Sequence, residues 1–228
     1  MDFTNHYLGV LFEIFGIKFY ITETLVATWV VMAILIILAV VVRIRLRKFT
    51  LVPSGFQNAI EILVEMMDNF AISTMGESFR GFGGFFFGLF AFIICANYSG
   101  LLGLRPPTAD VATTAALSLI IFFVTHAVGI KRRKLGYLKS FVQPNVIFLP
   151  INLIGEVSNV LSLCFRLFGN MLGGVIIIGL VYNMFPPILK IGIPVALHAY
   201  FDIFAGALQA FIFTVLGMTF IRQKGTSE

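Results

Sequence analysis

Charged residues are scarce in this chain of 228 residues. Only 12% of the residues are charged, whereas 59% are hydrophobic and the mean hydropathy is +0.98. A chain of this composition cannot keep its whole surface in water, so a soluble protein is excluded and an integral membrane protein is indicated. Since one membrane helix takes about 20 apolar residues, five or six membrane segments would use up the chain and leave no soluble domain.

Cysteine is also rare, and several motifs are missing. Cys95 and Cys164 lie in apolar segments without CxxC spacing or a nearby pair of histidines, which argues against a disulfide or a metal site. There is no GxxxxGK[ST] loop, so we expect neither an ATP site nor a cofactor in this chain. The first residues carry no basic stretch ahead of an apolar run, so we do not expect a cleaved signal peptide.

Basic residues give a net charge of +5, but they stand at the ends of apolar segments and form no patch interleaved with aromatics. We therefore interpret them as topology signals and do not expect nucleic-acid binding. With the N-terminus outside and the C-terminus in the cytoplasm, three basic residues lie outside: Lys18, Arg105 and Lys190. Twelve lie inside: Arg43, Arg45, Arg47, Lys48, Arg80, Lys131, Arg132, Arg133, Lys134, Lys139, Arg222 and Lys224.

The apolar runs between these charges predict an all-α fold in one membrane domain, residues 1–228. Its predicted parts are an outside segment (1–22), a first span (23–48), an amphipathic surface helix (54–78), a second span (79–103), a third span (109–134) and two long helices (146–185 and 187–222). In the surface helix, Glu61, Glu65 and Asp68 form an acidic stripe, which is either a solvated face or a docking surface for another subunit.

The fourth apolar segment is too long for an upright span. Residues 150–185 would form a helix of roughly 54 Å, whereas the hydrocarbon core of a bilayer is roughly 30 Å thick. We therefore expect a tilted or bent helix, followed by a turn at 186–194 and a second long, tilted helix.

Arg166 stands in the middle of that segment, in "LSLCFRLFGNMLGG" (161–174). An arginine at the centre of a bilayer costs about 3 kcal/mol on insertion scales, so it should face a partner or water. Glu156 is ten residues away, roughly 15 Å along the helix axis and on another face, and is not a local partner. Ser162, Asn170 and Gly173 share one stripe with Arg166, and antiparallel pairing of the last two helices would bring Gln209 to the same depth.

The remaining polar residues fall into two groups by depth. Toward the outside lie Asn97, Asp110, Asn170, His198 and Asp202; toward the inside lie His126, Glu156, Ser158 and Asn159. Two polar routes interrupted by a fixed positive charge suit a protein that moves cations without leaking them. The alternative for Asn97, Asp110 and the two histidines is ordinary hydrogen bonding between helices.

Several motifs then match one family. "SLCFRLFGNMLGG" (162–174) resembles the signature of subunit a of F-type ATP synthases, and "ALQAFIFTVL" (207–216) resembles the motif of its final helix. "NYSGLLG" (97–103), "PPTADVATTAALSL" (106–119) and "LPINLIGE" (149–156) are similar as well.

The resemblance implies a stator subunit with two half-channels that carry H⁺, or alternatively Na⁺, to and from carboxylates on a rotating ring of c subunits. Arg166 would be the essential charge facing the ring, with Asn170, Gln209 and Ser162 around it. Asp202 would belong to the outer half-channel, together with Asn97, Asp110 and His198, and Glu156 to the inner one, together with Ser158 and His126. Implied partners are the c-ring, the peripheral-stalk b subunits, the rest of the ATP synthase complex and the lipid bilayer.

The chain departs from the family pattern at two places. Val175 stands where some bacterial members have glutamate, and "SNVLS" (158–162) replaces the commoner S-R/K-P-L-S. Asp202 would therefore work with other partners. Two other functions stay open: a secondary transporter that binds an anionic substrate at Arg166, although no internal repeat supports it, and a purely structural membrane anchor.

Overall fold

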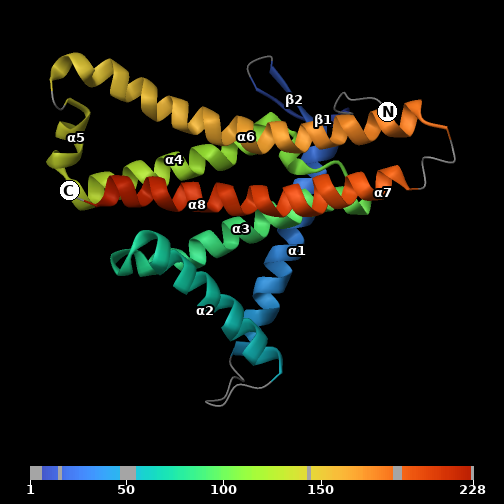
Figure 1. The fold of residues 1–228 in the computed structure, drawn as a ribbon, viewed down its shortest axis with the longest axis horizontal. Helices are drawn as coiled ribbons and strands as arrows, with labels where there is room; N and C mark the ends of the chain where they lie inside the picture. The colour runs from blue at the N-terminus through green and yellow to red at the C-terminus, as the bar shows by residue number, and fades with distance from the viewer. Residues whose placement is uncertain (1–6, 15–16, 47–54, 143–144, 187–191, 227–228) are drawn as a thin grey trace. The chain divides into compact units, whose positions relative to one another are not determined.

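A computed structural model of the protein describes residues 7–14, 17–46, 55–142, 145–186 and 192–226. These residues are helical apart from one short hairpin and the connecting segments (Figure 1). They group into two compact units. The first comprises residues 1–52, 91–110 and 167–210, and the second comprises residues 53–90, 111–166 and 211–228.

Five helical segments in the described ranges have the length and the apolar composition of membrane spans. They are Glu23–Leu46, Glu77–Leu102, Val111–Arg133, Val146–Met184 and Ile193–Gly225. Their number and apolar character confirm the predicted all-α membrane fold.

Within these segments the regular helices are α1 (Glu23–Leu46), α3 (Gly83–Tyr98), α4 (Val111–Arg133), α6 (Leu149–Met184), α7 (Ile193–His198) and α8 (Gly206–Gly225). Short tight helices adjoin α3, α4 and α6 at Glu77–Phe82, Ser99–Leu102, Pro107–Ala109 and Val146–Phe148.

The first unit contains a β-hairpin where only an outside segment was predicted. Strand β1 (Tyr7–Ile14) pairs antiparallel with β2 (Ile17–Thr22), so that Tyr7 lies opposite Thr22. Strand β2 leads directly into α1, and the Thr22 hydroxyl caps the helix by accepting a hydrogen bond from the backbone N–H of Leu25, 3.2 Å away.

Charges at the helix ends follow the direction of the helix dipole. Helix α1 has Glu23 in its first turn and Arg43 and Arg45 in its last turn, and α4 ends with Lys131, Arg132 and Arg133. The positive charges stabilise the carbonyl ends of these helices, in addition to acting as topology signals.

The second unit contains two further helices, α2 (Phe56–Met75) and α5 (Leu135–Val142). Helix α2 ends at Gly76, whose φ of 96° suits glycine. After α4, Lys134 takes a φ of 50° and turns the chain back, so that the Tyr137 ring covers Gly129; a Cβ at that glycine would lie 2.6 Å from the ring. Only Met67, Ala71 and Met75 of α2 are buried, while Leu63 and Val64 of its predicted apolar side are exposed.

Helices α4, α6 and α8 contact one another in the core of the second unit (Figure 1). A Cβ at Gly217 of α8 would lie 3.0 Å from the Ile121 side chain of α4, and the Thr114 hydroxyl of α4 is 3.5 Å from the Cys164 sulfur of α6. The buried side chains of this core include Phe79, Phe86, Leu117, Leu163, Phe213, Met218 and Ile221.

Helix α6 is unbroken over 36 residues, which confirms the predicted long helix of roughly 54 Å. The second long segment is less regular. Residues 187–191 of the predicted helix 187–222 lie outside the described residues, and α7 begins with Pro194 in its first turn. A π-helix, η5 (Ala199–Ala205), then leads into α8. Such wide turns are rare and occur frequently at functional sites.

Candidate functional site

Arg166 lies on an exposed face of α6. Two other side chains of α6, Leu161 and Phe165, are 48% and 56% exposed, and Ser162, one turn before the arginine, is exposed as well. Nothing lies within 4 Å of a Cβ built at Gly169 or Gly173, one and two turns further on. Among the described residues of its own unit, Arg166 has no hydrogen bond or ion pair.

A charge on an apolar, exposed face of a membrane helix calls for a counter-charge or water from outside the chain. The two glycines leave this face open to another surface. Asn170 is half-buried, and Gln209, which is 5% exposed, belongs to the other unit. The expected meeting of Gln209 with Arg166 stays a prediction.

His198 and Asp202 meet directly in the first unit. They are four residues apart, across the junction of α7 and the π-helix, and His198 Nδ1 lies 2.5 Å from Asp202 Oδ2. The Asp202 side chain is 6% exposed and that of His198 is 30% exposed. The pair therefore joins a buried carboxylate to a partly exposed imidazole.

A cavity of about 810 Å³ adjoins this pair. Val175, at the position where relatives with a glutamate would add a second acid, also lines it. Three further polar residues of the lining were not predicted as site residues: Glu23, Arg105 and Tyr182. From the sequence, Glu23 was interpreted as the start of a helix and Arg105 as a charge in a loop. No local pattern shows that these two residues, which are far apart in the chain, line one cavity.

Asn97 and Asp110, the other two residues predicted for the outer route, make hydrogen bonds within the first unit and do not line this cavity. Asn97 is fully buried; its side-chain nitrogen donates to the Gly206 carbonyl and its oxygen accepts from the Thr108 hydroxyl, both at 2.7 Å. Asp110 accepts a hydrogen bond from the Thr24 hydroxyl of α1 at 2.8 Å. Both residues thus stabilise the surroundings of the cavity.

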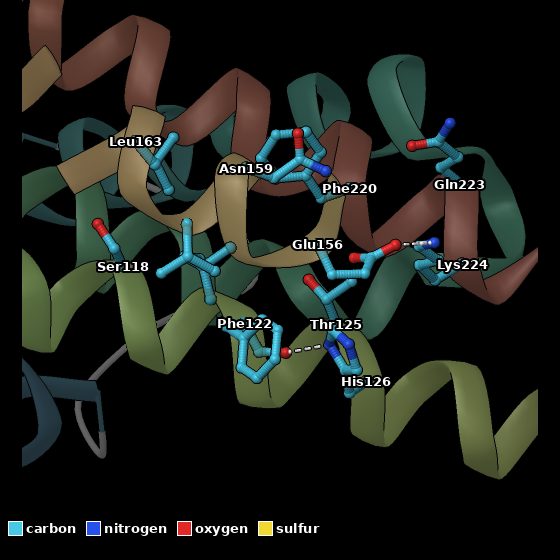
Figure 2. A pocket seen from close by; sticks show the side chains of 12 residues that line it. Ser118, Phe122, Thr125, His126, Glu156, Asn159, Leu163, Phe220, Gln223 and Lys224 are labelled. Carbon is cyan, nitrogen blue, oxygen red and sulfur yellow. Dashed lines mark hydrogen bonds and ion pairs between the residues drawn. The ribbon is translucent and has the colours of Figure 1, made fainter. Parts of the chain in front are cut away.

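The second unit holds a smaller cavity, of about 20 Å³, between α4, α6 and α8 (Figure 2). Glu156 of α6 forms an ion pair there with Lys224 of α8, and these side chains are 13% and 23% exposed. The ammonium group also lies 5.4 Å from the centre of the Phe141 ring. Lys224 was predicted only as a topology charge; its proximity to Glu156, 68 residues away in the chain, is a tertiary feature.

His126 of α4 lines the same cavity (Figure 2). Its Nδ1 lies 2.9 Å from the Phe122 carbonyl oxygen, and the Phe122 ring lies against the imidazole, tilted by 42° with a centroid separation of 3.9 Å. The cavity therefore brings together two residues predicted for the inner route, His126 and Glu156. The third, Ser158, lies exposed on α6 and does not line it.

Asn159, which the sequence analysis placed toward the inside, also lines this cavity. Other polar groups near it were missed. Ser118, Thr125 and Gln223 contribute to its lining. Tyr137 of α5 is 1% exposed, and its hydroxyl has no hydrogen-bond partner among the described residues. Burial and the nearby Glu156 carboxylate raise the pKa of Tyr137 to about 12, against the opposing effect of Arg133.

Together, these features define a multi-pass membrane protein with an exposed arginine on a long apolar helix and a histidine and a carboxylate in each of two separate cavities. The sequence model of the family described as ATP synthase A chain matches residues 25–222. The chain belongs to this family.

Curated relatives agree. The chain is 39% identical over 203 residues to ATP synthase subunit a 2 of Bradyrhizobium sp. (strain BTAi1), covering 88% of this chain and 87% of the relative. It is 36% identical over 205 residues to ATP synthase subunit a of Citrifermentans bemidjiense, covering 88% and 86%. It is 33% identical over 227 residues to ATP synthase subunit a of Geotalea daltonii, covering 97% and 94%.

The predicted family and function are thereby confirmed: the protein is a stator subunit of an ATP synthase complex with a role in proton translocation. The comparisons lend no support to the secondary-transporter alternative.

Proposed function

We propose that the two cavities are parts of two half-channels and that protons pass between them only by way of carboxylates on a rotating c-ring. In this mechanism the cavity beside His198 and Asp202 opens to the outside, and the cavity beside His126 and Glu156 opens to the cytoplasm. Arg166 faces the ring between them. Ser162, Asn170 and Gln209 restrain the arginine side chain.

The exposed position of Arg166 carries this proposal. An unpaired guanidinium on an apolar face is costly in a bilayer unless another subunit brings an acidic group to it. A ring carboxylate that has released its proton is such a group, and the nearby guanidinium would favour its ionised form. The open surface at Gly169 and Gly173 supports the close passage of a ring helix.

The arginine also separates the two routes. Because a guanidinium keeps its proton, it cannot carry protons from one cavity to the other, and its charge repels a proton that would leak directly. A lysine at this position could lose its charge when buried. Arginine is therefore the residue type that blocks a leak while it attracts each ring carboxylate in turn.

The contact between Arg166 and a ring carboxylate should be wet or loosely paired. Breaking a dry, buried ion pair costs about 3 to 5 kcal/mol when one partner is left uncompensated. One elementary charge crossing 100 mV releases only about 2.3 kcal/mol. A dry pair would therefore hold the ring in place, and hydration lowers the barrier to the next step.

Orientation and partners follow from the distribution of charge. The positive-inside pattern supports an outside N-terminus, a cytoplasmic C-terminus and α2 on the cytoplasmic surface. The acidic residues Glu61 and Glu65 of α2 are exposed, together with Leu63 and Val64, and are available to the peripheral-stalk b subunits. We assign H⁺ as the ion, since each cavity combines a carboxylate with an imidazole, a group that exchanges protons near neutral pH.

Substitution of Arg166 tests the proposal. Arg166→Ala should abolish ATP-driven proton pumping and ATP synthesis in the assembled complex, because neither charge attraction nor the leak barrier survives. Leu161→Ala, at another exposed side chain of α6, is the control and should keep most of the activity. Co-purification with the other subunits measures assembly. Normal ATP synthesis by an assembled Arg166→Ala complex would overturn the proposal.

A further inference from the structure

We propose that the small cavity of the second unit binds one water molecule at Thr125 and His126, and that His126 accepts and releases protons there through Nε2. This inference rests on the proposed inner route and adds to it a specific proton-accepting group with its own bound water. Figure 2 shows both side chains at the cavity with Glu156 and Lys224.

The hydrogen bond at Nδ1 determines which nitrogen is free. A backbone carbonyl oxygen can only accept, so the contact between His126 Nδ1 and the Phe122 oxygen requires a proton on Nδ1 in either charge state of the ring. In the neutral ring, Nε2 then carries the lone pair. No hydrogen bond to Nε2 is formed by the described residues, so this nitrogen is available to a water molecule.

The neighbouring residue supplies a second unsatisfied group. Thr125 is 4% exposed and lines the same cavity, yet its hydroxyl has no hydrogen-bond partner among the described residues. A buried polar group without a partner costs about 1 to 3 kcal/mol. The cavity volume of about 20 Å³ is enough for one water molecule. A water bonded to Thr125 Oγ1 and His126 Nε2 would satisfy both groups.

The charges around the imidazole are paired with one another. The titratable groups that line the cavity or touch the ring are Glu156 from α6, Lys224 from α8 and Tyr137 from α5. The ammonium group of Lys224 is paired with Glu156, so the carboxylate does not face the imidazole as an unpaired charge.

The exchange step is a simple balanced proton transfer. A proton that arrives on the bound water moves to Nε2 and leaves a neutral water and an imidazolium. The same Nε2 proton returns to the water when the ring is deprotonated, while the Nδ1 proton stays on the hydrogen bond to Phe122. No bond other than N–H and O–H changes.

Substitution of His126 tests the proposal in the assembled complex reconstituted into vesicles, with pumping measured per ATP hydrolysed. His126→Gln keeps hydrogen-bonding groups but cannot take up a proton, and we expect pumping to fall roughly a hundredfold, the low end for a lost proton-transfer group. His126→Ala should reduce pumping by a similar factor. Added imidazole should restore pumping in the His126→Ala complex, whereas pyrazole, a ring of the same size that is a much weaker base, should not.

Three results would overturn the inference: unchanged pumping in His126→Gln, equal rescue by imidazole and pyrazole, or no change in pumping per ATP in the unsubstituted complex when the cytoplasmic pH is varied from about 5 to 8. The last measurement needs no variant.

Thr125→Val, which removes the second water ligand, should give a smaller loss of pumping than His126→Gln. Its control is Thr219→Val, whose exposed hydroxyl donates to the Val215 carbonyl.

The outcome is separable from that of the proposed function. If Arg166→Ala abolishes pumping while His126→Gln leaves it unchanged, the half-channel mechanism stands and only the role of His126 fails. If pumping survives in Arg166→Ala, the proposed function itself fails.

Discussion

The two cavities each combine a histidine with a carboxylate, but they do so differently. In the first unit, His198 and Asp202 lie one helical turn apart and bond directly at 2.5 Å, beside a cavity of about 810 Å³. In the second unit, His126 and Glu156 come from different helices, and each has another partner, the Phe122 carbonyl and Lys224. That cavity has a volume of only about 20 Å³.

The difference concerns how the charge of each carboxylate is balanced. The partner of Asp202 is an imidazole, which gains or loses its charge near neutral pH. The partner of Glu156 is an ammonium group, which ordinarily keeps its charge in that range. Asp202 is therefore bonded directly to the imidazole beside its cavity, whereas Glu156 is paired with an ammonium group and His126 bonds to a backbone carbonyl.

The largest expected effect comes from removing the acid of the first pair. Asp202→Asn leaves His198 without a carboxylate, so we expect ATP-driven pumping to fall roughly a hundredfold, as for loss of a proton-transfer group. Asp110→Asn is the matched control, because that carboxylate accepts from Thr24 and does not line the cavity. Pumping in vesicles measures both variants. Equal losses in the two would show that the direct pair has no special role.

A second substitution would make the inner cavity resemble the outer one. Lys224→Gln removes the fixed positive charge and leaves the Glu156 carboxylate without its partner. Since the pair is partly exposed, we expect a loss of roughly 1 to 3 kcal/mol in the free energy of unfolding in detergent. Arg222→Gln, a nearby exposed residue that donates to the Thr74 carbonyl, is the control. Equal stability of the Lys224→Gln and unsubstituted chains would contradict the charge-balance argument.

The smallest expected effect concerns Tyr137, whose pKa is about 12 in the folded chain and about 10 in an unfolded one. Because folding raises this pKa, the stability contributed by the protonated phenol is complete below about pH 10 and is lost as the pH rises toward about 12. Tyr137→Phe should remove that loss and, by deleting an unpaired hydroxyl, should stabilise the chain at neutral pH by up to about 1 kcal/mol.

Unfolding curves in detergent at several pH values measure the effect of Tyr137→Phe. Tyr200→Phe serves as the control, since the Tyr200 side chain is 56% exposed. A parallel fall in stability above pH 10 in wild-type and Tyr137→Phe chains would contradict the prediction.

Local patterns were sufficient for the helices. Runs of apolar residues ending in clusters such as Lys131–Arg132–Arg133 mark where a membrane helix must stop, so the five spans and the unbroken α6 could be predicted to within a few residues. The hairpin of β1 and β2 and the π-helix around Asp202 were missed. Both depend on backbone pairing that apolar periodicity does not record.

The candidate site was predictable in part. Arg166 could be predicted as a functional residue because a charge inside an apolar run is costly to place in a bilayer, and because the motifs around it resemble those of the family. Depth along the helices grouped Asn97 and Asp110 with Asp202. Depth alone does not show whether a polar residue lines a cavity or is engaged in a hydrogen bond inside the protein. In the folded chain, Asn97 bonds to Gly206 and Thr108, while Asp202 faces an open cavity.

The sequence by itself determined the membrane character, the number of spans, the family and the misplaced charge of Arg166, because each follows from composition or from residues close together in the chain. Only the tertiary structure decided that Lys224 balances Glu156, that His126 keeps Nε2 free and that Thr125 lacks a partner. The ion pair joins α6 to α8, whereas the free Nε2 follows from a hydrogen bond within α4, between His126 and the Phe122 carbonyl. Helices far apart in sequence bring single polar groups within hydrogen-bond distance, and no local pattern encodes which ones meet.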